Sequence, residues 1–327
     1  MFLILTLDFG SNSNKYLISL YSNGTVKLVK KDFFIHKLAK ELSIENYRYK
    51  MENFIEKIQK DLDYYQKLYK TSWVLGKAVG TEFYRIQKNS EISNEILNEI
   101  LNEIINEIIN EIIKINTTML QKININFEII SQKEESKLSI KPLKLFFNNY
   151  ISLDLGGAST EITVKKDNLY KNFFYKFGCL KEIKDYSFIQ DFVDFYFKKE
   201  LFDLELTLIG GSFVSTLQSL RSSKSLKSSK SSLSRKFFYT VKTKDLKNFL
   251  KKIENLKEEQ ISQKYPALKG REHSVKTALN FIIYLLEKIK KEKTKISLLT
   301  LLEGLTLELL ELNKLEFNKI EKIFKKQ

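Results

Sequence analysis

The chain has 327 residues, 43% of them hydrophobic, which is enough for two ordinary α/β domains with buried cores. Its net charge of +15 would attract polyanions, but Lys, Ile and Asn are abundant throughout, as an AT-rich gene would encode, so the charge alone identifies no ligand. The single cysteine, Cys179, excludes an internal disulfide bond, and without a membrane-length apolar run or a signal sequence we expect a soluble, cytoplasmic protein.

Strands and helices alternate along the sequence in the manner of an α/β fold. In the first part, the pattern predicts strands at 1–7, 15–20, 25–30 and 73–79, and helices at 47–69 and 81–89. The Ser22-Asn23-Gly24 turn is expected to join two of these strands as a hairpin. In the second part, the pattern predicts strands at 127–131, 150–154, 161–165, 169–175 and 206–209, a helix at 180–199, and a strand followed by a helix within 298–310.

A tetrapeptide repeat interrupts this alternation between residues 94 and 114, where Asn-Glu-Ile-Leu or Asn-Glu-Ile-Ile occurs five times. Four residues of a helix turn through about 400°, so the apolar pair drifts by about 40° in each repeat and no single face stays apolar. Two interpretations are open. The winding stripe could meet a partner helix, or the repeat could result from slippage in the gene.

A second unusual segment, residues 219–235, consists of Ser, Lys, Arg and Leu, a composition that cannot bury enough surface to order itself. We expect a mobile basic loop here. It is either a tolerated insertion or a flexible arm that collects a polyanionic substrate.

The most informative pattern is a strand that ends in Asp-x-Gly and a hydroxyl-rich turn, and it occurs twice. The first copy is Asp8-Phe9-Gly10-Ser11-Asn12-Ser13, and the second is Asp154-Leu155-Gly156-Gly157-Ala158-Ser159-Thr160-Glu161. Glycine lets the turn backbone approach an oxyanion, small neighbours leave its N–H groups accessible, and the Asp can hold a cation or a water. Two such turns predict a duplicated domain, with phosphate bound in a cleft between the halves.

Three further segments make this pattern specific. They are Gly80-Thr81-Glu82-Phe83-Tyr84-Arg85-Ile86-Gln87-Lys88-Asn89, Glu128-Ile129-Ile130-Ser131-Gln132-Lys133-Glu134-Glu135-Ser136 and Gly210-Gly211-Ser212. Taken in chain order, the five segments resemble those of the exopolyphosphatase/guanosine pentaphosphate phosphatase (Ppx/GppA) family. The family's motifs are Asp-x-Gly-Ser-Asn-Ser, Ala-Thr-Ser-Ala-x-Arg-x-Ala-x-Asn, Glu-Val-Ile-Ser-Gly-x-Glu-Glu-Ala and Asp-x-Gly-Gly-Gly-Ser-Thr-Glu, followed by a third glycine turn.

The resemblance covers most of the chain and implies two actin-like (ribonuclease H-like) α/β domains. We expect them at residues 1–125, including the repeat, and 126–327, including the basic loop. The cleft between them should narrow when phosphate bridges its walls. The chain is similar to the short form of the family, which lacks an added C-terminal helical domain, and a homodimer is common in the family.

Cleavage of a phosphoanhydride requires an in-line water, neutralisation of the phosphate oxygens and a carboxylate that orients or deprotonates the water. Glu135 follows a predicted strand end and matches the family's catalytic glutamate, although Glu134-Glu135 is also typical of the acidic first turn of a helix. The resemblance implies that Glu161 positions the water and that Asp8, Asp154 and Glu161 hold Mg²⁺, with K⁺ as a further candidate ion. The expected phosphate-binding residues are Gly10, Ser11, Asn12, Ser13, Lys15, Arg85, Gly156, Gly157, Ala158, Ser159, Thr160, Gly210, Gly211, Ser212 and Arg271.

Several positions depart from the family pattern. Ala158 replaces a glycine, and Lys15 stands where Arg is frequent, which keeps the charge but loses the bidentate fork. Arg271-Glu272-His273 stands in place of Arg-Ala-Asp, and Leu302-Glu303-Gly304 in place of Arg-Glu-Gly. These changes predict a reduced rate or an altered chain-length preference.

Three functions are weighed. The first is a phosphoanhydride hydrolase, an exopolyphosphatase or guanosine pentaphosphate phosphohydrolase that releases terminal phosphate with Mg²⁺. The second is a sensor that binds polyphosphate or guanosine tetraphosphate without turnover. The third, an ATP-using kinase or actin-like ATPase, fits worst because Glu134-Glu135 and Arg85 belong to the phosphatase pattern. We expect no specific nucleic acid and no membrane as partners.

Overall fold

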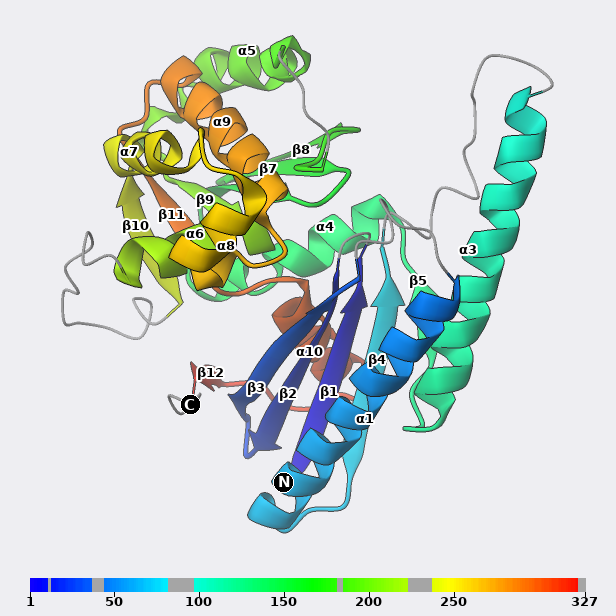
Figure 1. Ribbon diagram of the computed structural model, residues 1–327. Coiled ribbons are helices and arrows are strands. Elements are labelled where there is room, and N and C mark those ends of the chain that lie inside the picture. Colours follow the sequence, from blue (N-terminus) through cyan, green and yellow to red (C-terminus); the bar gives the residue numbers. More distant parts are fainter. Residues whose placement is uncertain (11–12, 37–43, 82–96, 181–184, 223–236, 323–327) are drawn as a thin grey trace. The chain divides into compact units, whose positions relative to one another are not determined.

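The computed structural model describes residues 1–10, 13–36, 44–81, 97–180, 185–222 and 237–322 (Figure 1). The chain divides into two compact units. The first unit is Met1–Leu138 with Leu301–Gln327, and the second is Ser139–Thr300. This division differs from the expected boundary after residue 125, because β5, most of α4 and the C-terminal α10 and β12 belong to the first unit.

A six-stranded mixed sheet forms the first unit, in the order β12-β3-β2-β1-β4-β5. The strands are β1 (Phe2–Phe9), β2 (Ser13–Ser22), β3 (Thr25–Ile35), β4 (Val74–Gly80), β5 (Phe127–Ile129) and β12 (Lys319–Lys322). The first three are antiparallel, and β4 and β5 continue the sheet parallel to β1. The predicted hairpin forms at Asn23 and Gly24, whose φ values of 48° and 71° are typical of a type I′ turn.

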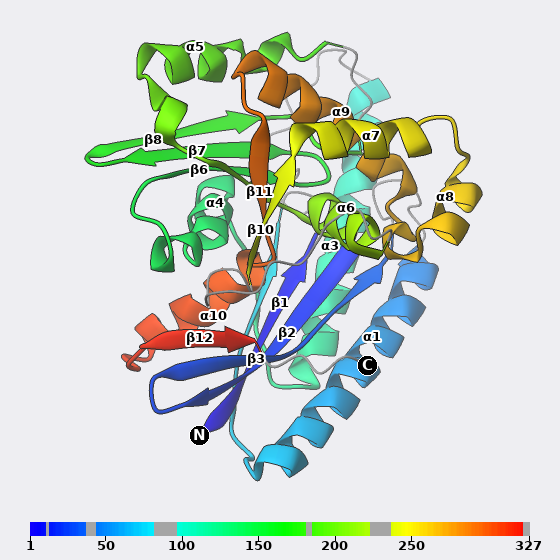
Figure 2. The same ribbon diagram turned by 90° about the vertical axis from the view of Figure 1, so that its left-hand side faces the viewer.

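Helices cover both faces of this sheet, as Figure 2 shows for α1 and α10. One face presents the alternate residues Leu3, Leu5, Leu7 and Phe9 of β1 to α1 (Ile44–Tyr69) and α3 (Leu97–Gln121). On the other face α10 (Leu301–Leu312) lies over β1, β2 and β4, and Leu301 and Leu305 form a small core with Val79. The C-terminal segment is therefore integral to the first unit.

The second unit repeats this arrangement in its own sheet, in the order β10-β11-β9-β6-β7-β8. Its strands are β6 (Tyr150–Leu155), β7 (Thr160–Lys166), β8 (Leu169–Tyr175), β9 (Leu206–Ile209), β10 (Phe238–Lys242) and β11 (Lys293–Ser297). Its α-helices are α5 (Gln190–Lys198), α6 (Gly211–Ser222), α7 (Thr243–Ile253), α8 (Glu258–Lys264) and α9 (Glu272–Lys288). The helix α4 (Gln132–Ile140) crosses the boundary between the units.

Each unit thus contains an antiparallel three-strand meander followed by two strands parallel to its first strand. The meander is β1-β2-β3 in the first unit and β6-β7-β8 in the second. The predicted duplicated α/β architecture is confirmed, because sheets that share this topology form the two units. Within the described residues, no helix is long and apolar enough to cross a membrane.

Some predicted elements differ from the observed ones. In the range 180–199, where one helix is expected, residues 181–184 lie outside the described residues. Among the residues described there, a 3₁₀ turn at Ser187–Ile189 and α5 are the helical segments. The expected strand in 298–310 is absent, because β11 ends at Ser297 and α10 begins at Leu301. The first residues of the expected basic loop, from Ser219 to Ser222, belong to α6, where the buried Ser219 hydroxyl donates to Ser215 O at 3.0 Å.

The tetrapeptide repeat is helical where it is described, since α3 begins at Leu97. Among the side chains that the structure describes in α3, Ile112 of the repeat is buried, as are Ile115, Met119 and Leu120 after it, and α3 packs beside α1 (Figure 1). The helix predicted at 81–89, apart from Thr81, and residues 223–235 of the basic loop lie outside the described residues.

Candidate functional site

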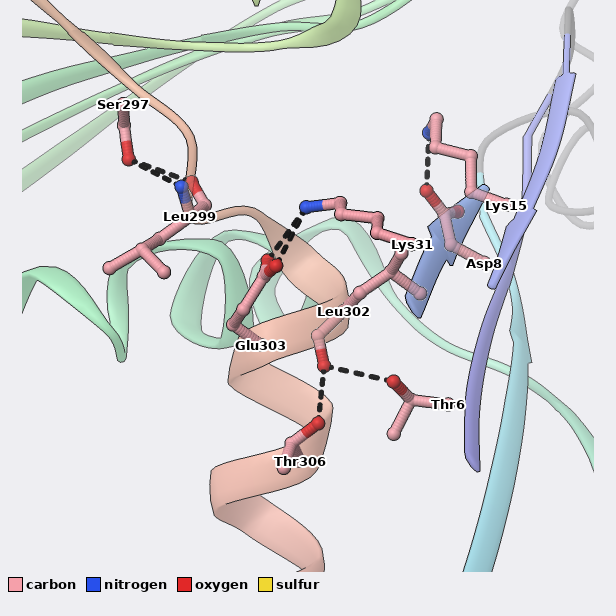
Figure 3. Close-up of polar contacts among 9 residues, drawn as sticks. All are labelled: Thr6, Asp8, Lys15, Lys31, Ser297, Leu299, Leu302, Glu303 and Thr306. Carbon is pink, nitrogen blue, oxygen red and sulfur yellow. Dashed lines mark hydrogen bonds and ion pairs between the residues drawn. The ribbon is translucent and has the colours of Figure 1, made fainter. Parts of the chain in front are cut away.

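The first Asp-x-Gly turn joins β1 to β2. The Gly10 N–H donates to Ser13 O at 3.1 Å and closes the turn. The strand pairing places Lys15 directly opposite Asp8, and Lys15 Nζ contacts Asp8 Oδ2 at 2.5 Å (Figure 3). Asp8 is 5% exposed, so the ammonium group neutralises a largely buried carboxylate. The candidate residues Ser11, Asn12 and Arg85 lie outside the described residues.

Two neighbouring strands end beside this turn. Because β1, β4 and β5 are parallel, their carboxyl ends lie at the same edge of the sheet. Thr81, the first residue after β4, donates its backbone N–H and its hydroxyl to Phe9 O at 3.0 and 3.3 Å. The segment after β5 carries Glu134 and Glu135, so this edge brings together three of the predicted motifs.

The two adjacent glutamates have different environments. Glu134 Oε2 accepts hydrogen bonds from the Ser131 N–H at 2.8 Å and the Ser131 hydroxyl at 2.7 Å, while the Glu134 N–H donates to Ser131 Oγ at 3.2 Å. This reciprocal pattern is a capping box at the start of α4. The hydrogen bonds from Ser131 lower the pKa of Glu134. Glu135, by contrast, is half-buried and its side chain takes no part in the box.

The second Asp-x-Gly turn repeats the first in the second unit. The Gly156 N–H donates to Ser159 O at 3.0 Å, the counterpart of the bond from Gly10 to Ser13. Here the residue opposite the aspartate is Glu161, which pairs with Asp154 across β6 and β7. Directly opposite side chains lie on one face of a sheet, about 5 Å apart at Cβ. The same position therefore carries a lysine in one unit and a second carboxylate in the other.

The backbone after β8 supports this second turn. The N–H groups of Cys179 and Leu180 donate to Gly156 O at 3.0 Å and Gly157 O at 2.9 Å. A Cβ on Gly178 would lie 2.2 Å from Ala158 N, so only glycine allows this approach. The motifs did not identify Gly178, and the only available signal was a glycine soon after a strand.

Two candidate residues of the second turn need separate comment. The Thr160 side chain is fully buried and its hydroxyl donates to Phe177 O at 2.6 Å, so it stabilises the turn and does not present a donor to phosphate. Ala158 does not have a positive φ, and the loss of the usual glycine there causes no backbone strain.

The third glycine turn lies beside the second, because β6 and β9 are parallel neighbours. Gly210 has a φ of 129°, and a Cβ there would lie 2.7 Å from Leu155 O. A Cβ on Gly211 would lie 2.5 Å from Arg271 Nη1, so the guanidinium group lies against the start of α6. The structure therefore brings together the second turn, the third turn and the buried Arg271.

The side chain of Ser212 is buried among other side chains. Its hydroxyl lies 3.2 Å from Ser274 Oγ and 3.8 Å from Cys179 Sγ. Burial raises the pKa of the Cys179 thiol. Glu272, which departs from the family pattern, accepts the Gly270 N–H at 2.8 Å and so stabilises the backbone next to Arg271.

The altered C-terminal motif has a structural role in the first unit (Figure 3). Glu303 is 1% exposed and forms an ion pair with Lys31 of β3 at 2.7 Å. The carbonyl oxygen of Leu302 accepts the Thr6 hydroxyl at 3.1 Å. A Cβ on Gly304 would lie 1.9 Å from Leu138 O, so glycine allows α10 to cross α4 closely.

The carboxylates can be compared with the needs of a metal ion. No group of three or more His, Cys, Asp or Glu side chains suited to a metal occurs in the part of the chain that the structure describes. Mg²⁺ is usually held by one or two carboxylates, with substrate phosphates and waters as the other ligands. Asp154 and Glu161 fit that donor set. Asp8 does not fit it as well, because the Lys15 ammonium contacts its carboxylate.

Comparisons with known proteins agree with this fold. The model of the Ppx/GppA phosphatase family matches residues 17–313. A crystal structure of the Aquifex aeolicus Ppx/GppA phosphatase, type II variant, is similar with a TM-score of 0.55 and 16% identity, over 94% of this chain and 99% of that one. An exopolyphosphatase from Cytophaga hutchinsonii has a TM-score of 0.64 and 15% identity, over 96% and 98% of the two chains. No curated protein sequence matches the chain.

Proposed function

This chain belongs to the Ppx/GppA phosphatase family, and we propose that it hydrolyses phosphoanhydride bonds and releases terminal phosphate from inorganic polyphosphate. The observation that carries the proposal is the position of Arg271. Its guanidinium group lies against Gly211 at the start of α6, beside the second Asp-x-Gly turn. An arginine at a helix N-terminus next to a glycine turn provides the charge and the N–H donors that phosphate oxygens require.

We propose phosphate-binding residues in each unit separately. In the first turn we assign Gly10, Ser11, Asn12, Ser13 and Lys15, with Arg85 from the segment after β4. In the second unit we assign Gly156, Gly157, Ala158, Ser159, Gly210, Gly211 and Arg271, and Ser212 through its backbone, since its hydroxyl is buried. Such backbone cradles bind anions because several N–H dipoles converge on one point. The N–H groups of Gly10 and Gly156 close their turns, so these two glycines contribute by letting the backbone approach the anion.

Glu135 is the proposed base that orients and deprotonates the attacking water. The capping box supports this assignment, because it gives Glu134 a structural role at the start of α4. Of the two neighbouring glutamates, Glu135 is therefore the candidate base. Glu135 follows the strand end beside the first turn and is half-buried, which suits a carboxylate that must face a reacting group.

Asp154 and Glu161 are the residues that would hold Mg²⁺. When bound, the ion would neutralise phosphate oxygens in the transition state. Asp154 and Glu161 are paired directly across β6 and β7, and we propose that Glu161 also positions the water. We propose that Lys15 keeps Asp8 neutralised and directs its remaining ammonium donors to phosphate. Guanosine pentaphosphate has the same terminal linkage and is the second proposed substrate.

Phosphate release tests this proposal. Purified protein should release phosphate from long-chain polyphosphate, guanosine pentaphosphate or both when Mg²⁺ is present, and removal of the metal with EDTA should stop the release. The relative rates on polyphosphate and guanosine pentaphosphate show which of the two substrates the protein prefers. Binding of guanosine tetraphosphate or polyphosphate without any release would instead support the sensor function. The expected cleft and its closure on phosphate stay predictions.

A further inference from the structure

His36 is a buried titratable residue to which the proposed chemistry assigns no role. It follows β3 and is 3% exposed. Its Nε2 lies 2.9 Å from Asn14 Oδ1, and the imidazole also hydrogen-bonds the backbone of Gly10. Gly10 and Asn14 are the residues on either side of the first turn, so a single side chain contacts both ends of that turn.

Asn14 continues these contacts into the helical layer. It is fully buried, and its Nδ2 lies 3.1 Å from Met51 Sδ and 3.4 Å from the Tyr47 hydroxyl, both on α1. The Tyr47 hydroxyl donates to Asn116 Oδ1 of α3 at 2.8 Å. The His36 ring also packs edge-on against the Tyr47 ring, with 5.5 Å between the centroids. The turn is therefore connected to α1 and α3 through His36 and Asn14.

The charge state of His36 suits a fixed structural link. Burial lowers its pKa to about 3, and the positive charges of Lys50 on α1 and Lys15 on β2 act in the same direction, against the hydrogen bond to Gly10. The imidazole is consequently neutral near pH 7, and its single N–H donates to Asn14 Oδ1 in one tautomer and to the Gly10 backbone in the other. A neutral ring in this position neither transfers a proton to substrate nor repels the nearby lysines.

We propose that His36 is a positioning residue that holds the first Asp-x-Gly turn in its phosphate-binding geometry. This inference rests on the proposed function of that turn. The physical reason is preorganisation: a turn that is held at both ends does not lose conformational freedom again when it binds an anion. Loss of the imidazole should therefore weaken phosphate binding while the step that depends on Glu135 changes little.

The test compares His36→Ala with His36→Gln, whose amide keeps a donor and an acceptor. In phosphate release from polyphosphate, we expect His36→Ala to raise KM about tenfold, equivalent to about 1.4 kcal/mol, and to change kcat less than about threefold. His36→Gln should restore most of the affinity. Leu62→Ala is the matched control, because Leu62 is buried in the same core but lies 11 residues beyond Met51 on α1, about 16 Å away along the helix.

Two measurements without turnover separate this inference from the proposed function. Calorimetric titration with tripolyphosphate in EDTA should give a Kd about tenfold higher for His36→Ala than for wild type and Leu62→Ala. Hydrogen exchange at the amides of Gly10, Ser13 and Asn14 should be faster in His36→Ala alone. If wild type releases no phosphate, the proposed function fails, while these two measurements still decide the inference. An unchanged Kd and unchanged exchange in His36→Ala would overturn the positioning role of His36. If His36→Ala does not fold, the same comparison is made with His36→Gln and His36→Asn. Of these two variants, only His36→Asn, with the shorter amide, should lose affinity.

Discussion

Lys15 binds Asp8 across β1 and β2 at 2.5 Å, which makes a neutral pair of the aspartate in the first Asp-x-Gly turn. In the second unit the corresponding position is Glu161, opposite Asp154. The two halves of the duplicated fold therefore place opposite charges at equivalent positions. One pair suits an anion near a lysine, and the other suits a divalent cation.

The pair in the first unit predicts a stability effect. Lys15→Met should reduce the free energy of unfolding by about 1–3 kcal/mol, because Asp8 would be left as a buried carboxylate without its partner. The double variant Asp8→Asn/Lys15→Met should recover part of this loss, since no charge remains unpaired. Urea denaturation of the two single variants and the double variant measures the coupling. Additive losses would show that the two side chains do not interact.

The pair in the second unit predicts a metal effect. Glu161→Gln should raise the Mg²⁺ concentration needed for half-maximal phosphate release by about tenfold or more, because a hard cation prefers a carboxylate to an amide. Lys15→Gln, changed at the equivalent position, should leave the Mg²⁺ requirement unaltered. A metal titration of both variants makes the comparison, and equal requirements would contradict the assignment.

The two neighbouring glutamates should respond differently to the same substitution. Glu135→Gln should lower kcat by about 10² to 10⁴, the usual contribution of a general base. Glu134→Gln should keep both activity and stability, because glutamine also completes a capping box, whereas Glu134→Ala should cost about 0.5–1 kcal/mol. Initial rates and thermal unfolding of the three variants test this. Comparable rates for Glu135→Gln and wild type would exclude Glu135 as the base.

Gly211 and Gly304 should tolerate alanine differently. At Gly211 the added Cβ meets the Arg271 guanidinium, a side chain that can move, so Gly211→Ala should fold and raise KM for polyphosphate. At Gly304 the Cβ meets the Leu138 backbone at 1.9 Å, so Gly304→Ala should lose stability. Kinetics and denaturation of both variants test the prediction. The reverse result, with KM unaffected at Gly211, would argue against Arg271 as a phosphate ligand.

His36 makes the stability of the fold depend on pH. Its pKa is about 3 when folded and about 6.5 when unfolded, so the unfolded chain binds the additional proton. Stability attributable to this residue is therefore complete above about pH 6.5 and falls as the pH decreases, by about 2 kcal/mol at pH 5. Urea denaturation at pH 7 and pH 5 should show a smaller loss in His36→Gln than in wild type. Equal losses would mean that the buried imidazole does not cause the effect.

Much of the fold could be predicted because its signals are local. The strand 169–175 and the strand 206–209 coincide with β8 and β9, since alternation and turn residues mark their ends. The observed division of the chain, with a boundary after Leu138 and a return to the first unit at Leu301, could not be predicted in the same way. The pairing of β12 with β3 joins residues almost 300 positions apart, and no local pattern carries that information.

The sequence by itself determined the duplicated Asp-x-Gly turns, the glycine turn at Gly210 and the family, because these depend on residue types at fixed short spacings. The tertiary structure decided which side chains meet: Lys15 with Asp8, Glu303 with Lys31, Arg271 with Gly211, and His36 with both ends of the first turn. It also assigned Glu134 to a helix cap and Thr160 to a buried hydrogen bond. The reason is physical, since strand register and burial select the partner of a polar side chain, and both arise only when distant segments pack.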